Sequence, residues 1–263
     1  MIRQAIWLEC FRLRKRLATW VLYLIFLTLT IFLVGALLYS GHHGHVRGPY
    51  SGFPGAWETV LTAGAPVASL FAAVLVALSV CSEFEWRTSR QNLIDGLSRE
   101  HWLLGKVLLI PIICVALYGT QIILGTLWAY FETYPPHRLF LYPGSTYVMA
   151  GVGVLVGMFW YSLTALLISV LVRSSGPAIG LILVYQVFDN IVARTLRGFH
   201  LDGIAAWFPF QVHNSLLEFK QYWPQPSPTL DYHWATWNLL LAGVMWAIAF
   251  AVVARWVYLR RDL

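Results

Sequence analysis

The sequence predicts an all-α integral membrane protein with six transmembrane helices, and two observations lead to this prediction. Hydrophobic residues make up 59% of the 263 residues and charged residues 11%, whereas a soluble domain carries about 25% charged residues to cover its surface. Six apolar stretches approach the roughly 20 residues that a helix needs to cross the hydrocarbon layer. These stretches show no alternation of polar and apolar residues, which favours helices over a β-barrel.

Charge and cysteine content exclude two other classes. The net charge of +6 does not indicate a nucleic-acid partner, because the basic residues lie in short runs between apolar stretches rather than on one face of a soluble module. Cys10, Cys81 and Cys114 are far apart and form no CxxC pair. The cysteines therefore indicate neither a disulfide framework nor a zinc site.

The six expected spans are the main elements of the chain. They cover residues 17–38, 60–80, 102–130, 147–171, 177–192 and 237–257. The first apolar run is longer than the roughly 7 to 15 residues of a signal-peptide core and no cleavage site of small residues follows it, so we expect a permanent span. The fifth run is the weakest, because it is short and ends in Asp189 and Asn190.

The distribution of lysine and arginine predicts the orientation, because short cytoplasmic loops are enriched in these residues. Six spans place thirteen of the 18 basic residues on one side and five on the other. The larger set is Arg3, Arg12, Arg14, Lys15, Arg16, Arg87, Arg90, Arg99, Lys106, Arg173, Arg255, Arg260 and Arg261; the smaller set is Arg47, Arg138, Arg194, Arg197 and Lys220. We therefore expect both termini in the cytoplasm.

Residues 1–16 are expected to form a separate helix. Ile2, Ile6, Cys10, Leu13 and Leu17 recur every three or four positions and make one apolar stripe beside several basic residues. Such a helix would lie in the inner membrane interface with its basic groups toward anionic headgroups. The alternative is that these residues are only the charged start of the first span.

Residues 193–236 are expected on the extracytoplasmic side, before the last span. They contain the apolar patch 204–210, which is too short to cross the membrane. This patch could dip into the outer leaflet as short re-entrant helices, which requires other parts of the protein to cover the exposed backbone. It could equally be an external loop with interfacial tryptophans, and the sequence leaves both alternatives open.

The segment between the second and third spans, residues 81–106, is longer than a simple connector and is rich in charge of both signs. Residues 85–94 can form a short helix, Gly96 ends it, and Ser98 is suited to cap the next helix. Mixed charge on such a helix suits docking to another protein. From charge alone, a solvated face of self-paired groups is the favoured interpretation.

This segment resembles that of the ABC-2 type permeases, in which a Glu-rich exit from the second span leads to a Thr-Arg element, a Ser-Arg pair and a Lys at the foot of the third span. The matching residues are Glu83, Glu85, Thr88, Arg90, Ser98, Arg99 and Lys106. Many members have Gly before the Thr, whereas this sequence has Arg87. The resemblance covers residues 1–263 as one transmembrane domain, from the basic interfacial N-terminus to the short basic end.

The resemblance implies a bacterial inner-membrane permease that exports an amphipathic or hydrophobic substrate such as a lipid, peptide, antibiotic or drug. Segment 83–99 would include the coupling helix that docks on a separate ATPase subunit. Two permease chains and two ATPases would form the transporter. The residues expected to couple it to the ATPase are Glu83, Glu85, Arg87, Thr88, Arg90, Asp95, Ser98 and Arg99. The sequence has no GxxxxGK[ST] loop, so ATP and Mg²⁺ are expected on the partner and no cofactor on this chain.

Polar residues inside the spans are further candidates. A substrate path could include Gln121, Tyr161, Tyr185 and Asp189. Interhelical hydrogen bonds are the commoner use of the first three. Asp189 is a functional candidate as an ionisable residue in a span, but the favoured alternative places it at the outer interface near Arg194 and Arg197. Outside the first span lie three imidazoles suited to transition metals, His42, His43 and His45. No carboxylate or thiol is close to them in the sequence, so we predict no metal site.

Two other classes compete with the transporter. An intramembrane enzyme would need a motif such as HExxH or GxSxG, or paired acids on facing helices, and the sequence has none of these. A membrane anchor that recruits a cytosolic ATPase without moving a substrate is compatible with the same charged segment.

Overall fold

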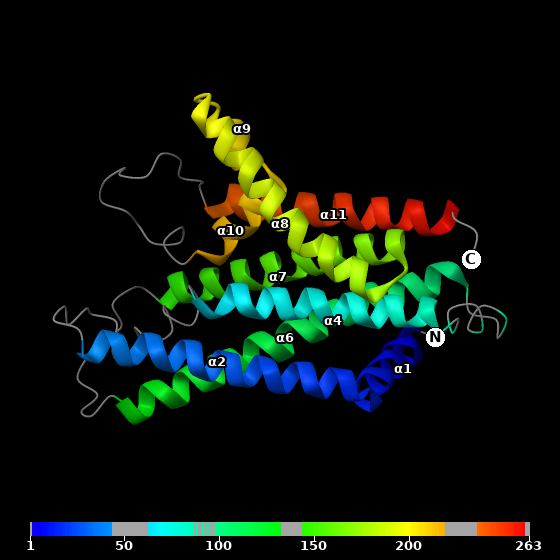
Figure 1. Cartoon of the computed structure of the whole chain (residues 1–263), viewed down its shortest axis with the longest axis horizontal. Coiled ribbons are helices and arrows are strands. Elements are labelled where there is room, and N and C mark those ends of the chain that lie inside the picture. The colour runs from blue at the N-terminus through cyan, green and yellow to red at the C-terminus, as the bar shows by residue number, and fades with distance from the viewer. Residues whose placement is uncertain are drawn as a thin grey trace.

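The computed structural model describes residues 2–43, 63–86, 88, 91, 94, 98–132, 144–218 and 236–260, and over these residues the chain is helical without strands. Most of the chain forms a bundle of long helices (Figure 1). The helices are α1 (Ile2–Lys15), α2 (Leu17–His43), α4 (Ala65–Glu85), α6 (Arg99–Glu132), α7 (Gly144–Val172), α8 (Ser175–Gly198), α9 (Asp202–Ala206), α10 (Pro209–Leu217) and α11 (Thr236–Arg260). The predicted all-α fold class is confirmed.

Five helices are long and apolar enough to cross a membrane, namely α4, α6, α7, α8 and α11. Their number rises to six if Trp7–Lys15 and Leu17–Leu33, which are bent by 76° at a short break, count as one span. The multi-pass membrane character predicted from the apolar runs is therefore confirmed. Helix α8 is longer than the predicted fifth span and continues beyond Asp189 and Asn190 to Gly198.

Helix α7 is at the centre of the bundle, where it packs against α4, α6, α8, α10 and α11. In its most apolar window 67% of the residues are buried, compared with 22% for α8. Helix α4 brings small, fully buried residues to this centre, including Ala65, Ala68, Ala72 and Ala73. Small residues let helix backbones approach closely, which is how membrane helices gain packing contacts without a hydrophobic driving force.

Both ends of the chain lie at the same end of the bundle. The start of α1, the end of α4, the start of α6 and the end of α11 meet there (Figure 1). We call this the terminal end. At the terminal end an ion pair connects Glu100 of α6 to Arg255 of α11, with 2.5 Å between Oε1 and Nη2.

The predicted N-terminal helix is α1, which packs against α6 and turns sharply into α2 at Arg16. The turn is fixed by the indole of Trp20, which donates from Nε1 to the carbonyl oxygen of Arg14 at 2.8 Å. Of the predicted apolar stripe, Cys10 and Leu13 pack against the core, whereas Leu17 is exposed. The stripe ends early because Leu17 already belongs to α2, whose axis points in another direction.

Within residues 193–236, the described part of the chain contains the end of α8 and the short helices α9 and α10. Helix α10 is buried against α7, α8 and α11, and its Phe210, Val212 and Leu216 are almost inaccessible. The approach of α11 is close, because a Cβ at Gly243 would lie 2.7 Å from the Leu216 side chain. Other helices therefore pack closely around α10.

Candidate functional site

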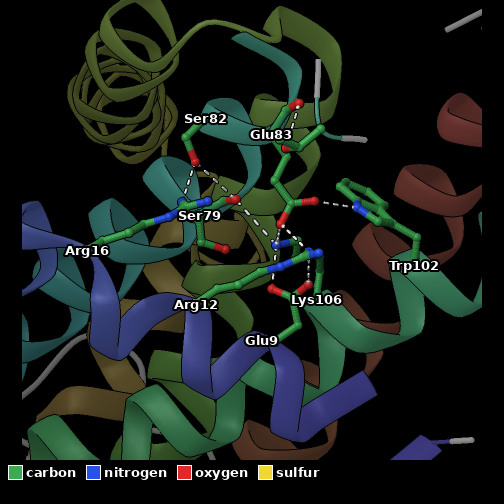
Figure 2. Close-up of polar contacts among 9 residues, drawn as sticks. Glu9, Arg12, Arg16, Ser79, Ser82, Glu83, Trp102 and Lys106 are labelled. Carbon is green, nitrogen blue, oxygen red and sulfur yellow. Dashed lines mark hydrogen bonds and ion pairs between the residues drawn. The ribbon is translucent and has the colours of Figure 1, made fainter. Parts of the chain in front are cut away.

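Four charged side chains from three helices meet inside the terminal end of the bundle (Figure 2). Glu9 and Arg12 come from α1, Glu83 from the last turn of α4, and Lys106 from the first part of α6. We call these four residues the charge cluster. Glu9 and Arg12 are three positions apart, so both project from the same face of α1.

Lys106 is the centre of the charge cluster and is buried. Its Nζ donates to Glu9 Oε2 at 2.6 Å and to Glu83 Oε1 at 2.5 Å. The same Nζ donates to the carbonyl oxygen of Ser79 at 3.3 Å. An ammonium group has three N–H donors, so these three acceptors use all of them.

Glu83 is 1% exposed and uses both carboxylate oxygens. Its Oε2 accepts a hydrogen bond from Trp102 Nε1 at 2.6 Å. Arg12 Nη1 lies 3.4 Å from Glu83 Oε1 and 3.4 Å from Glu9 Oε1. The Trp102 ring stacks on Tyr258 of α11 with 4.8 Å between centroids, so the contacts of Glu83 extend to the last helix.

The charge cluster is formally neutral, because it combines two carboxylates with two cations. Burial of an unpaired charge is strongly unfavourable, so removal of one partner from such a group costs about 3 to 5 kcal/mol. The pairing of these four charges therefore holds α1, α4 and α6 together at the terminal end of the bundle.

A second contact joins the turn after α1 to α4. Arg16, between α1 and α2, donates from Nη1 to Ser82 Oγ, and this hydroxyl in turn lies 3.5 Å from the carbonyl oxygen of Ser79 (Figure 2). The last turn of α4 thus contacts α1 through the charge cluster and the turn through Arg16.

Glu85, two residues after Glu83, points to a different helix. Its Oε1 accepts hydrogen bonds from the backbone N–H of Ser175 at 2.7 Å and from the Ser175 hydroxyl at 2.9 Å. Ser175 is the first residue of α8, whose own N-cap residue Ser174 makes no capping bond with its side chain. A carboxylate satisfies free N–H groups at a helix N-terminus and suits the helix dipole, so Glu85 caps α8 from the end of α4.

The start of α6 is fixed by residues that the sequence had singled out. Ser98 accepts a hydrogen bond at Oγ from the backbone N–H of His101 at 3.2 Å, so the predicted N-cap is confirmed. Arg99 donates from Nη1 to the carbonyl oxygen of Leu259 at 3.4 Å, near the end of α11. Thr88 Oγ1 donates to the carbonyl oxygen of Glu83 at 3.4 Å.

The predicted ATPase-coupling residues therefore split into two groups. Arg87, Arg90 and Asp95 lie outside the described residues. The described ones, Glu83, Glu85, Thr88, Ser98 and Arg99, each bond within this chain. Their bonds hold the two ends of the segment against the bundle rather than projecting outward.

Between these ends the described side chains are exposed. Thr88, Gln91 and Ile94 are helical, and the residues between them lie outside the described part of the chain. Trp86 is 79% exposed and Ile94 is 75% exposed. Exposed large apolar residues mark contact surfaces when they gather at one place.

Sequence reasoning missed Glu9, Arg12 and Trp102 as site residues. A signal was available, because Glu9 is the only acidic residue before Glu58 and lies next to Cys10 of the apolar stripe. Lys106 is likewise a single charge inside an apolar run, which is a costly position unless a partner neutralises it. The identity of the partners depends on tertiary packing and could not be read from these positions.

Three of the four predicted substrate-path residues come together where α7, α8 and α10 meet. Tyr185 and Asp189 are one turn apart on α8, and Tyr185 lies within electrostatic range of Asp189 and Tyr161. Among the described residues, Tyr161 Oη, Tyr185 Oη and Asp189 Oδ2 are buried and have no hydrogen-bond partner. Gln121 instead donates from Nε2 to the carbonyl oxygen of Gly64 at 2.5 Å, before α4.

Asp189 also fixes the start of α10. The backbone N–H groups of Phe210 and Gln211, in the first turn of α10, hydrogen bond to its carboxylate. Gln211 donates from Nε2 to Asn190 Oδ1 at 3.0 Å. The polar pair therefore does not end α8, because α10 supplies partners for both side chains.

His213 of α10 is a buried residue that sequence reasoning did not single out. Its ring nitrogens lie 3.2 Å from Ser69 Oγ and 3.1 Å from the carbonyl oxygen of Gly157. The ring stacks on Tyr161, with centroids 4.8 Å apart. Burial lowers the pKa of His213 from 6.5 to about 3, so the ring is neutral near pH 7.

The described part of the chain contains no group of three His, Cys, Asp or Glu side chains placed to hold a metal ion. Of the three histidines weighed in the sequence, His42 and His43 belong to the last turn of α2, and His45 lies outside the described residues.

The fold and the apolar helices define a multi-pass α-helical membrane protein. Residues 44–263 match the family described as protein of unknown function, DUF2705, and the chain belongs to this family. No curated protein matches the sequence.

Proposed function

We propose that the chain is the membrane-spanning permease subunit of an ATP-driven ABC transporter of the ABC-2 type. It would pair with a second permease chain and with a separate ATPase that binds ATP and Mg²⁺. The cargo would be an amphipathic or hydrophobic molecule moved out of a bacterial cell across its inner membrane. In this proposal α1 is the interfacial helix, and α2 is the first of six spans.

The observation that most supports this proposal is the pair of exposed apolar side chains, Trp86 and Ile94, on a segment whose ends are fixed in the bundle. Their exposed fractions are 79% and 75%. Large apolar residues of this kind are the usual anchors of protein interfaces. We infer that the segment is the coupling helix and that Trp86 and Ile94 meet the ATPase.

The bonds at the segment's ends suit the transmission of motion. Glu83 begins the segment and belongs to the charge cluster, while Arg99 ends it and contacts α11. Because Glu83 is buried, its contribution is to connect α4 to α1 and α6 and not to touch the ATPase. A displacement of the segment would then reach α1, α4, α6 and α11 together.

ATP can drive transport only if the ATP-bound ATPase favours one arrangement of the helices over another. When the helices change from one arrangement to the other, the ion pairs of the charge cluster would either stay together or break together. The apolar α8, which is mostly exposed, and the buried polar atoms of Tyr161, Tyr185 and Asp189 are the elements that a moving substrate would meet in this proposal.

The test is to isolate the tagged chain from its native membranes and to assay the preparation for ATP hydrolysis in lipid nanodiscs. We expect an ATPase to co-isolate and Trp86→Ala to lower its amount and its activity at least several-fold. Trp237→Ala is the matched control, because Trp237 is 65% exposed at the other end of α11. It should leave both values unchanged.

Three results would overturn the proposal. The first is the absence of a nucleotide-hydrolysing polypeptide from wild-type preparations. The second is an equal effect of Trp86→Ala and Trp237→Ala. The third is labelling of an Ile94→Cys variant from the periplasmic side. If the ATPase binds but its activity is insensitive to every change in the charge cluster, the chain acts as a membrane anchor for the ATPase.

A further inference from the structure

An apolar cavity of about 390 Å³ lies under the turn between α1 and α2. Leu13, Trp20 and Tyr23 line it from α1 and α2, and Leu109, Ile113 and Leu117 line it from α6. Its walls are almost wholly hydrocarbon and aromatic. An apolar pocket that opens at the surface of a membrane protein favours an apolar chain over a polar solute.

One charged residue, Arg14, belongs to the lining of this cavity. Its neighbours are engaged, because Arg12 belongs to the charge cluster, Lys15 lies over the Phe11 ring and Arg16 donates to Ser82. Arg14 itself is exposed, and within the described residues its guanidinium forms no ion pair or hydrogen bond. The cavity thus combines apolar walls with one available cation.

We propose that this cavity binds an anionic phospholipid of the leaflet in which α1 lies, with one acyl chain against Trp20 and Leu117 and the phosphate on Arg14. Basic pockets between membrane helices bind anionic headgroups, and an apolar cavity next to such a pocket accommodates the chain. The proposal requires that the chain is embedded in a membrane, but it does not depend on an ATPase partner.

The cavity lies next to the charge cluster, so a bound lipid would also affect the cluster. Cys10 lines the cavity and follows Glu9, and Leu109 lines it one turn after Lys106. An acyl chain between α1 and α6 would therefore support the two helices whose side chains meet at Lys106. The bound lipid would hold α1 in the position that the charge cluster needs.

The experiment uses the full chain in phosphatidylcholine nanodiscs that contain a minor fraction of a lipid brominated on its acyl chains. Bromine quenches the fluorescence of nearby indoles. The fluorescence of Trp20 is obtained by subtracting the signal of the Trp20→Phe variant from that of the wild type. We expect brominated phosphatidylglycerol to quench Trp20 about fivefold more effectively than brominated phosphatidylcholine, as one cationic contact implies. Unlabelled phosphatidylglycerol should compete with the brominated lipid and relieve the quenching. This competition uses the wild-type chain alone.

Two variants locate the site. Arg14→Gln should abolish the preference for the anionic lipid, whereas Lys15→Gln, which removes a neighbouring exposed cation outside the lining, should retain it. Ala116→Phe, which fills the cavity from α6, should reduce quenching by both lipids. Circular dichroism checks the folding of each variant.

Equal quenching of wild-type Trp20 by the two brominated lipids would overturn the proposal. So would an equal loss of preference in Arg14→Gln and Lys15→Gln, because general attraction of anionic lipid to a basic helix would then explain the result. These readouts involve no ATP, so their failure is distinct from failure of the transporter proposal.

Discussion

At the residue scale, Lys106 is the position where a single change should have the largest effect. Its ammonium group is buried and pairs with two carboxylates from two other helices. The exposed pair Arg255–Glu100 has a comparable distance, 2.5 Å, but solvent screens it. The two pairs therefore separate the effect of burial from that of geometry.

We predict that Lys106→Met lowers the free energy of unfolding by about 3 to 5 kcal/mol, because it leaves Glu9 and Glu83 without their main partner. Arg255→Met should cost at most about 1 kcal/mol. Thermal unfolding in detergent, followed by circular dichroism, measures both. The double variant Lys106→Met with Glu83→Gln, which restores neutrality, should be more stable than Lys106→Met alone, and a further loss would contradict the electrostatic explanation.

The pH dependence of stability should report on His213. Burial lowers the pKa of His213 from 6.5 to about 3, so the folded protein disfavours the charged ring. The neutral ring's contribution is complete above pH 6.5 and is lost as the pH falls toward about 3. The limiting slope for one proton is about 1.4 kcal/mol per pH unit.

We therefore predict that His213→Gln removes part of the loss of stability that the wild type shows between about pH 7 and about pH 5. Unfolding midpoints over this range provide the measurement. His200→Asn is the control, because His200 is an exposed histidine at a positive φ of 60° that Asn tolerates. An unchanged pH profile for His213→Gln would show that the ring is not buried as a neutral group.

At the element scale, the short helix α10 depends on contacts from other helices more than on its own sequence. It is nine residues long, which is too short for an isolated helix to be stable in water. Asp189 of α8 hydrogen bonds to the N–H groups in its first turn. The position of α10 should therefore be sensitive to this one carboxylate.

We predict that Asp189→Leu destabilises α10 by about 1 to 3 kcal/mol, because it leaves buried N–H groups without an acceptor. Asp189→Asn retains an acceptor oxygen and should have a smaller effect. Cysteine accessibility at a Ser215→Cys substitution in α10 gives the readout, with faster labelling expected for Asp189→Leu. Equal labelling in wild type and both variants would contradict the capping role.

Most of the long helices could be predicted from the sequence. The helices α4, α6, α7, α8 and α11 follow from long apolar runs, because a single physical requirement, the thickness of the hydrocarbon layer, sets their length. The Ser98 cap followed from local chemistry. The choice between a loop and short helices before α11 stayed open, since it depends on Asp189 and Asn190 of a different helix.

At the scale of the whole molecule, the least predictable feature is the charge cluster. Glu83 and Lys106 were noted for their resemblance to a family motif, but their partner Glu9 lies 97 positions from Lys106 in the sequence. Pairing across that separation arises from the 76° bend between α1 and α2. The break between residues 16 and 17 was predicted from the apolar stripe, but the partners that Glu9 meets could be identified only in the folded chain.

The formal neutrality of the charge cluster has a consequence for how the membrane potential acts on the protein. A charge that crosses the field contributes about 2.3 kcal/mol per 100 mV. Two carboxylates that move together with two cations carry no gating charge, since their contributions cancel. A rearrangement that moves these four side chains together should therefore draw no energy from the membrane potential through the charge cluster, in energised and de-energised cells alike.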